Sequence, residues 1–465
     1  SQLLAGGPRA VFQNALEWAK LASKHDFLNC IEAYQTTINL LPQFIWLGAT
    51  TRQRYQDLST AENLAVSAAC AAILASEYML ALKWLEHARC VVWNQSLMLR
   101  SPLDQLHSSH PALATRLQTV ASQIHSASSE NQSIGHRAVL SNSMTPEQAG
   151  QQRCRLAKEY QELLAQARQL PKFENFLRPM TAENLTSAAG NGPVVVINCH
   201  TDRCNALLIL PGNTDITHIP LTDFTEEKAR TSRIQLEKSL RLRERGVKPL
   251  WQPQYKDHTE SVLATLWTHI VKPVLDALGY INDPPKDSLP HITWCPTGAL
   301  SFLPLHAAGD YSQPQERVFN YAISSYTPTV TALITSTPTT LGTNCRVLAI
   351  GQSATPGHGT LPGTVKELAS IESHMQGKAE YSQLVDYQAT TRAALDAMEQ
   401  HDWVHLACHA HQNVADPTKS GFFLHNGTLD LASINQRSFR NKGLAFLSAC
   451  QTATGDEKLP DEAIH

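Results

Sequence analysis

Two reactive side chains, an imidazole and a thiol, each follow a short apolar segment in the C-terminal part of the sequence. The segment Trp403–Cys408 is followed directly by His409, and the segment Leu444–Ala449 is followed directly by Cys450. Short apolar segments of this kind are typical of buried strands. In an open α/β sheet, functional side chains gather beyond the carboxyl ends of the strands. The sequence therefore predicts that His409 and Cys450 lie at the same edge of one sheet.

An imidazole beside a thiol is the arrangement that cysteine nucleophiles use. The imidazole favours the thiolate, which attacks a carbonyl carbon, and later protonates the leaving amine. Backbone N–H groups at the strand ends would hold the oxyanion. We therefore predict a Cys–His dyad formed by Cys450 and His409. On these two residues alone, a structural histidine and a structural cysteine are the more common explanation.

The same part of the chain contains more histidine and cysteine than a dyad needs. His405, Cys408 and His411 lie close to His409, which raises the alternative of a metal site. No second Cys/His cluster supplies the remaining ligands at a recognisable spacing, so structural zinc is the minor alternative. Because it lies inside an apolar strand, His405 is more simply a core histidine, and Cys408 a buried thiol.

A glycine-rich segment, Gly351–Leu368, lies between a predicted strand and a predicted helix, where phosphate-binding loops occur. It does not fit the P-loop pattern, because Thr364 follows Gly363 where that pattern has lysine. The spacing from Gly359 to Gly363 does not fit the dinucleotide-binding pattern either. We expect this segment to be a flexible connection near the functional edge of the sheet, and we expect no nucleotide site.

The segments around the dyad alternate between strand and helix. The predicted strands are 346–351, 380–385, 403–408 and 444–449, and the predicted helices are 364–375 and 392–399. Asn426-Gly427 predicts a hairpin turn between two apolar runs. Upstream, 194–199, 205–212 and the segment that follows predict a meander of strands. Alternating β and α units indicate an α/β domain with a mostly parallel sheet covered by helices.

The N-terminal part is predicted to be helical. Apolar residues at helical spacing predict helices at 15–22, at 31–41 with Pro42 ending it, at 64–75 and at 78–93. These pairs fit degenerate tetratricopeptide (TPR) repeats and a generic helical bundle about equally well. We predict an all-α region over 1–125, a linker with helices over 126–190, whose Ser/Asn/Gln-rich stretch 126–150 is a loop, and an α/β domain over 191–465.

Composition and charge exclude several classes of partner. The formal net charge is −3, which gives no electrostatic reason to expect nucleic acid or an anionic membrane as a partner. The longest apolar runs are too short to span a bilayer. A helix over Glu226–Lys248 contains seven Arg or Lys residues between 228 and 245 and is expected to be a solvated surface. Ten scattered cysteines without a CxxC pair indicate reduced thiols and a cytoplasmic location. We expect both ends of the chain to be truncated.

The segments LAFLSACQTATGDEKLPDEAIH (444–465) and WVHLACHAH (403–411) together strongly resemble the CHAT domain. This is a caspase-like family of clan CD cysteine peptidases related to separase and caspases. WCPTGALSFLPLHAA (294–308) is similar to an upstream strand-turn block of that family. ALKWLEHARCVVW (81–93) resembles the helical repeats of TPR-CHAT proteins, notably fungal ones. The resemblance covers about residues 190–465 well and 1–125 loosely.

The resemblance implies a role for each matching residue. His409 would be the general base and acid, and Cys450 the nucleophile. The backbone amides of Ala410 and Cys450 would form the oxyanion hole, although the family often has glycine where Ala410 stands. His405 would take a buried framework position. The acidic residues Asp456, Asp461 and Glu462 would favour a basic P1 residue, although Asp461 and Glu462 are equally explained as acids at the start of a helix. The family implies neither a metal nor an organic cofactor.

The function implied by the resemblance is that of an intracellular cysteine endopeptidase acting on a protein or peptide substrate. Its helical repeats would receive a regulatory protein partner. Two alternatives remain open: a non-catalytic interaction or signalling scaffold with a caspase-like fold, and a metal-binding protein that uses the cluster His405–His411.

Overall fold

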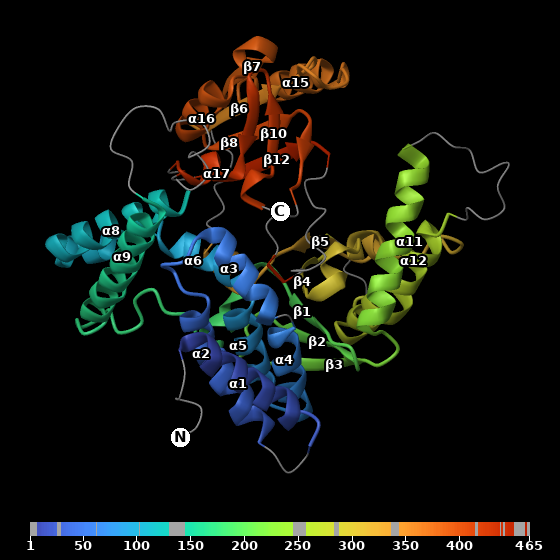
Figure 1. The fold of residues 1–465 in the computed structure, drawn as a ribbon. Coiled ribbons are helices and arrows are strands. Elements are labelled where there is room, and N and C mark those ends of the chain that lie inside the picture. The colour runs from blue at the N-terminus through green and yellow to red at the C-terminus, as the bar shows by residue number, and fades with distance from the viewer. Residues whose placement is uncertain are drawn as a thin grey trace.

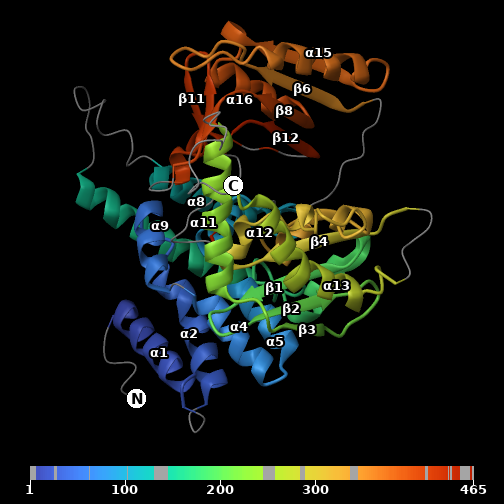
Figure 2. The same ribbon diagram turned by 90° about the vertical axis from the view of Figure 1, so that its right-hand side faces the viewer.

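The chain folds into a helical N-terminal part, a middle sheet and a second sheet, as the computed structural model in Figure 1 shows. In a view turned by 90°, the second sheet with its helices lies above the middle sheet and the N-terminal helices (Figure 2). The structure describes the residues 7–25, 29–61, 63–101, 103–129, 145–244, 257–282, 288–335, 344–413, 417–437, 439, 442–450 and 461–462.

The N-terminal part consists of helices that pack as neighbouring pairs. Their bounds are α1 (Pro8–Ala22), α2 (Cys30–Phe44), α3 (Thr51–Leu58), α4 (Leu64–Leu74), α5 (Tyr78–Ala88), α6 (Val91–Met98), α7 (Asp104–Ser109), α8 (Pro111–Ser129) and α9 (Pro146–Ala167). Phe12 of α1 stacks on Phe44 of α2, with ring centroids 4.1 Å apart. The predicted helical region is therefore confirmed, whereas its relation to TPR repeats stays a prediction.

Two predicted helix bounds in this part are wrong. Pro42 does not end α2, which continues to Phe44. The proline lacks only its own N–H, and the helical bond from the N–H of Ile45 to the carbonyl of Leu41 is still made beyond it, at 2.8 Å. The segment predicted as one helix over 78–93 is broken between α5 and α6. Arg89 there is extended and Cys90 has a left-handed φ of 50°. The backbone N–H of Cys90 donates to the carbonyl of Asp461, 3.0 Å away, instead of to its own helix.

The loop predicted over 126–150 is shorter than expected at both of its ends. Helix α8 runs through Ser129, and α9 begins at Pro146. Thr145 and Gln148 form a reciprocal capping box at the start of α9, which explains why the helix begins there. Residues 130–144 of the predicted loop lie outside the described residues.

The middle sheet has the strand order β3-β2-β1-β4-β5. Its strands are β1 (Val194–Cys199), β2 (Cys204–Ile209), β3 (Thr217–Leu221), β4 (His291–Pro296) and β5 (Ile323–Tyr326). β1, β2 and β3 form the predicted antiparallel meander, and β4 and β5 run parallel to β1. The sheet is therefore mixed, because hairpins connect its first three strands.

Helices cover both faces of the middle sheet. They include α10 (Ala182–Leu185), α11 (Glu226–Glu244), α12 (Thr259–Leu266), α13 (Lys272–Ala277) and α14 (Val330–Thr335). Alternate residues of β1 point to opposite faces. Val194 and Val196 join the core of the N-terminal helices, whereas Val195 and Ile197 pack with α12 and α13. The N-terminal helices and the middle sheet thus share one hydrophobic core.

The second sheet has the order β12-β8-β6-β7, and all its pairs are parallel. Its elements are β6 (Arg346–Gly351), α15 (Gly363–Met375), β7 (Glu380–Val385), α16 (Thr391–Gln400), β8 (Trp403–Ala407) and β12 (Leu444–Ser448). Between β8 and β12, an antiparallel sheet is formed by β9 (Ala410–His411), β10 (Gly421–Leu424) and β11 (Gly427–Asp430), followed by α17 (Leu431–Asn435). The prediction of a C-terminal α/β region with mostly parallel sheets is confirmed.

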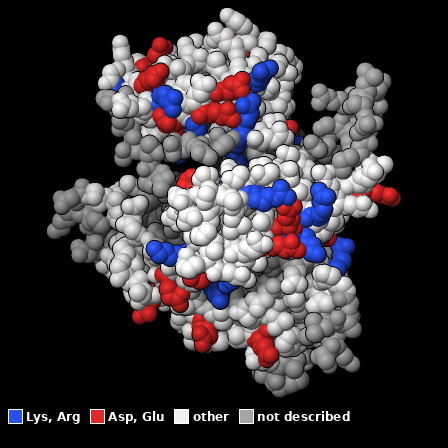
Figure 3. All heavy atoms as spheres, turned by 90° about the vertical axis from the view of Figure 1, so that its left-hand side faces the viewer, with Lys and Arg blue, Asp and Glu red and all other residues white. Residues whose placement is uncertain are grey.

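The surface carries charges of both signs. On the face drawn in Figure 3, Lys and Arg side chains alternate with Asp and Glu among the described residues, without a large patch of one sign. Within the parts of the chain that the structure describes, no helix has the length and apolar character needed to cross a bilayer. The helix predicted over Glu226–Lys248 is present as α11 as far as Glu244, where the described residues end.

Candidate active site

The two candidate catalytic residues follow neighbouring strands that are paired in register. β12 pairs with β8 in parallel, from Leu444 opposite Trp403 to Ser448 opposite Ala407. His409 and Cys450 each come two residues after the last paired position of their strands. If this register continued for two more residues, His409 and Cys450 would lie opposite each other at the same edge of the sheet.

The imidazole of His409 is oriented by a backbone carbonyl of the glycine-rich segment. Its Nε2 lies 2.7 Å from the carbonyl oxygen of Gly359. A carbonyl oxygen can only accept a hydrogen bond, so Nε2 is the protonated nitrogen of the ring. Nδ1 of a neutral ring is then left to accept a proton. No side-chain pattern in the sequence indicates this role of Gly359, because any residue type provides a carbonyl oxygen.

One aromatic ring packs on the ring of His409, and two more lie close by. The ring of His358 stacks on His409 with a centroid distance of 5.2 Å and also packs on Phe423 at 4.2 Å. His411 stacks on the same phenylalanine at 4.9 Å. The carbonyl of His409 accepts the backbone N–H of Phe423, 2.8 Å away. The histidine is thus held through its backbone by β10 and through its ring by the glycine-rich segment.

The start of the glycine-rich segment is itself fixed to the second sheet. Gln352 donates its backbone N–H to the carbonyl of Ala407, 3.0 Å away. The carboxylate of Asp386 accepts the backbone N–H of Ser353 at 2.8 Å and also its hydroxyl. The start of the segment is therefore bonded to the sheet, whereas its flexibility stays a prediction. The prediction that the segment lies near the sheet edge is confirmed by its bond to His409.

His405 lies inside β8, four residues before His409. Only 9% of it is exposed. Its Nε2 lies 3.0 Å from a carboxylate oxygen of Glu367 on α15. Its ring stacks on Phe446 of β12 at 5.0 Å, with the ring planes 9° apart. His405 thus ties β8 to both α15 and β12, which fits the framework position expected for it.

The two cysteines nearest to the sheet edge differ in accessibility. Cys408 is buried, and burial raises the pKa of its thiol to about 12, so it stays neutral and unreactive. Cys450 is exposed. Both Cys450 and His409 are described, and no hydrogen bond joins their side chains in this structure. The dyad therefore stays a prediction.

The remaining predicted site residues are only partly described. Ala410 begins the short strand β9 and pairs with Phe422 of β10. Asp456 lies outside the described residues. Within the described part of the chain, no group of three or more His, Cys, Asp or Glu side chains is arranged to hold a metal ion.

An apolar cavity of about 410 Å³ lies beside the second sheet. Val404 and Leu406 of β8 line it together with Ala445 and Leu447 of β12. These residues alternate with His405 along β8, so the cavity lies on the face of the sheet opposite to His405. Its lining also includes Ala410 and His411, which directly follow His409.

The family model of the CHAT domain matches residues 260–465, which is somewhat less than half of the chain. This part of the chain is a CHAT domain, and its fold is related to that of caspase-like peptidases. The match begins within α12 and includes both His409 and Cys450. It does not include β1, β2 and β3, although β1 pairs with β4, so the predicted domain boundary at 191 stays a prediction. Comparison with curated proteins finds no match.

Proposed function

We propose that the chain is a cysteine endopeptidase in which Cys450 is the nucleophile and His409 the general base and acid. The observation that carries the proposal is the contact of His409 Nε2 with the carbonyl of Gly359. It leaves Nδ1 as the proton acceptor of a ring that comes from the strand next to that of Cys450.

The proposed reaction proceeds in two steps. Sγ of Cys450 attacks the carbonyl carbon of the peptide bond while its proton passes to Nδ1 of His409. The oxyanion is held by backbone N–H groups, for which Ala410 and Cys450 are the candidates. The imidazolium then protonates the leaving amine, and a thioester remains. In the second step His409 takes a proton from water, the hydroxide releases the acid, and the thiol recovers its proton.

The proposed substrate is a protein or peptide, and the proposed location is the cytoplasm. We also propose that the helical region is a TPR region, so that the chain is a TPR-CHAT protein of the fungal type. The helical region would bind a regulatory protein partner. The chemistry needs neither a metal nor an organic cofactor.

Labelling with peptide electrophiles tests the proposal. Peptidyl chloromethyl ketones with Arg, Lys, Leu or Asp at P1, from which a thiolate displaces chloride to form a stable thioether, would be incubated with the chain, and the modified residue identified by mass spectrometry. We expect modification of Cys450 that is lost in Cys450→Ala and falls sharply in His409→Ala. Modification that persists in Cys450→Ala would show that another cysteine is the nucleophile.

A second candidate function is a non-catalytic scaffold with the same fold. The observation in its favour is that the thiol of Cys450 and the ring of His409 are not hydrogen-bonded to each other. A folded chain that is not modified by any of these probes would support the scaffold.

A further inference from the structure

A short helix of the N-terminal region, α6 (Val91–Met98), touches the chain on both sides of the strand that leads to Cys450. At its start, α6 contacts Asp461 and Glu462, which follow Cys450 in the sequence. Just beyond the end of α6, Arg100 contacts Asn435 and Arg437, which precede β12. These contacts lie far apart in the sequence and converge on one helix.

The contact at the start of α6 is a buried carboxylate on backbone N–H groups. Glu462 is 7% exposed, and its two carboxylate oxygens accept from the N–H of Val92 at 2.9 Å and of Trp93 at 3.4 Å. The first N–H groups of a helix lack partners within the helix, and a carboxylate satisfies them. Glu462 therefore caps α6 from a distant part of the chain.

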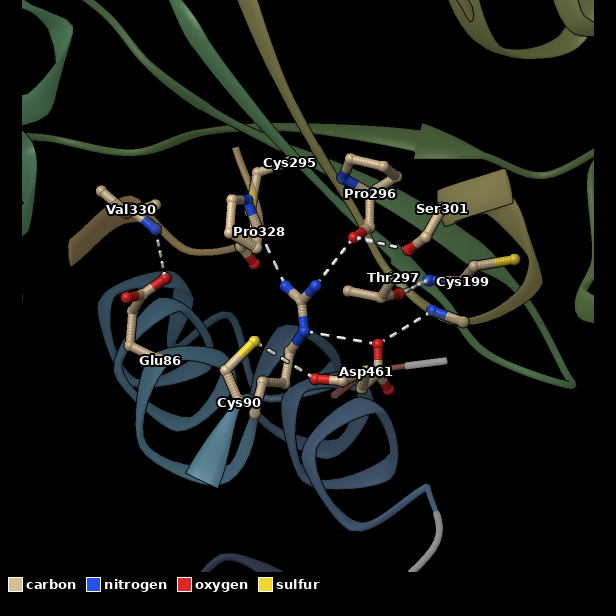
Figure 4. Close-up of polar contacts among 12 residues, drawn as sticks. Glu86, Cys90, Cys199, Cys295, Pro296, Thr297, Ser301, Pro328, Val330 and Asp461 are labelled. Atoms are coloured by element: carbon tan, nitrogen blue, oxygen red, sulfur yellow. Dashed lines mark hydrogen bonds and ion pairs between the residues drawn. The ribbon is translucent and has the colours of Figure 1, made fainter. Parts of the chain in front are cut away.

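The residue before Glu462 joins α6 to the middle sheet (Figure 4). Asp461 lies 3.3 Å from Nε of Arg89 and accepts the backbone N–H of Gly298 at 2.9 Å. Arg89 is 2% exposed and donates to the carbonyl of Pro296 at 2.8 Å. A buried guanidinium requires such partners, because an unpaired buried charge is strongly destabilising. The break between α5 and α6 thus brings Arg89 onto the end of β4.

The contacts beyond the end of α6 hold the chain that leads into β12. Arg100 donates to the carbonyl of Arg437 at 2.7 Å and to the side-chain oxygen of Asn435 at 3.3 Å. His125 of α8 lies with Nε2 2.7 Å from the carbonyl of Asn435 and must donate to it. Arg100 and His125 of the helical region therefore donate hydrogen bonds to carbonyl oxygens at the C-terminal end of α17, where basic side chains are favourable donors.

We infer that α6 clamps the chain on both sides of β12 and thereby sets the position and reactivity of Cys450. We call this arrangement the α6 clamp; it consists of α6 with Arg89, Arg100, Asp461 and Glu462. Fixing both ends of a segment reduces the conformations available to it. A partner that moves α6 relative to the sheets would alter the nucleophile without touching it. The inference rests on the proposed function, which supplies Cys450 with its role.

The test compares two clamp variants with a matched control in the same chain. Glu462→Ala removes the cap of α6, and Arg100→Met removes the contact with α17 while keeping most of the side-chain volume. Arg116→Met is the control, because Arg116 pairs with Glu159 between α8 and α9 and lies outside the clamp. For each variant, hydrogen exchange of β12 and the rate of Cys450 labelling by a peptidyl chloromethyl ketone are measured.

The clamp predicts faster exchange in β12 and slower labelling of Cys450 in both variants, by about threefold to thirtyfold. The control should match the unmodified chain in both measurements. If Glu462→Ala fails to fold, Arg100→Met still provides the comparison. Unchanged exchange in β12 for a folded clamp variant would overturn the inference, whether or not Cys450 is labelled.

The two measurements separate the failure of the inference from that of the proposed function. If Cys450 of the unmodified chain is not labelled, the proposed function fails, and β12 exchange alone decides whether the clamp exists. If labelling is strong and equal in every variant, the peptidase stands and the clamp is refuted.

Discussion

The buried carboxylate of Glu462 gives the α6 clamp a calculable dependence on pH. Burial raises the pKa of Glu462 from 4.5 to about 7, although the N–H groups of Val92 and Trp93 act in the opposite direction. We call the state with Glu462 bound at the start of α6 docked, and the state in which it has left α6 undocked. In the undocked state, the carboxyl group would ionise at its ordinary pKa. Each unit of pKa difference corresponds to about 1.4 kcal/mol, so the shift corresponds to about 3 kcal/mol. About 2.5 kcal/mol of this change in the stability of the docked state occurs between about pH 5 and about pH 8.

The sign of the effect follows from which state binds the proton more tightly. Between about pH 4.5 and about pH 7 the docked state holds the proton and the undocked state has lost it. The stability of the docked state is therefore fully present below about pH 4.5, falls as the pH rises to about 7, and is constant above that. Glu462→Gln removes this ionisation while keeping a side-chain oxygen that can accept one N–H.

Hydrogen exchange of the Val92 and Trp93 amides measures this effect as a local opening free energy. The exchange rates of both proteins are corrected for the intrinsic pH dependence and compared at about pH 5 and about pH 8. Other titrating groups are present in both proteins, so they cancel in the difference; Arg54 and Arg89 remain charged and Cys90 neutral. We expect the opening free energy of the unmodified chain to fall by about 2.5 kcal/mol more than that of Glu462→Gln. Equal pH dependence in the two proteins would refute the assignment of the raised pKa to Glu462.

Three further substitutions test individual packing and hydrogen-bond contacts of the fold. Glu86→Ala should lower the free energy of unfolding by about 2–4 kcal/mol in urea titrations, because the buried carboxylate caps α14 with hydrogen bonds of 2.7 and 3.0 Å; a loss below about 1 kcal/mol would contradict this. Glu367→Ala should lower the thermal stability of the second sheet by about 1–3 kcal/mol, since it leaves buried His405 without its carboxylate partner; Glu367→Gln should recover part of the loss. Gly421→Ala should destabilise by about 1–3 kcal/mol or more, because a Cβ there would lie 2.3 Å from the carbonyl oxygen of Leu429; unchanged urea unfolding would show that the hairpin adjusts.

The order of elements around the candidate site could be predicted from the sequence. Apolar segments separated by helical periodicity determine the α/β alternation, and a parallel sheet brings the ends of its strands to one edge. The apolar segments alone predict β8 and β12 as strands, and the structure pairs these two strands in parallel. The position of His409 opposite Cys450 follows only if that register is extended, and it stays a prediction.

The contacts that position the site could not be predicted in the same way. Gly359 acts through its carbonyl oxygen, which every residue type has, so no side-chain pattern indicates it. The break between α5 and α6 contains neither glycine nor proline, and Cys90 takes a left-handed conformation that tertiary contacts with Asp461 support. Asp461 and Glu462 appear in the sequence to be acids at the start of a helix. The structure instead pairs Glu462 with the start of α6, more than three hundred residues earlier.

The most direct test of the account is whether Cys450 forms an acyl intermediate that depends on His409. An activated peptide ester would be mixed with the chain, and the intact mass followed over time. We predict an acyl adduct that is located on Cys450, forms and then decays, and does not form at a comparable rate in His409→Ala. An adduct that forms equally fast without His409, or that lies on another cysteine, would contradict the dyad and with it the proposed peptidase.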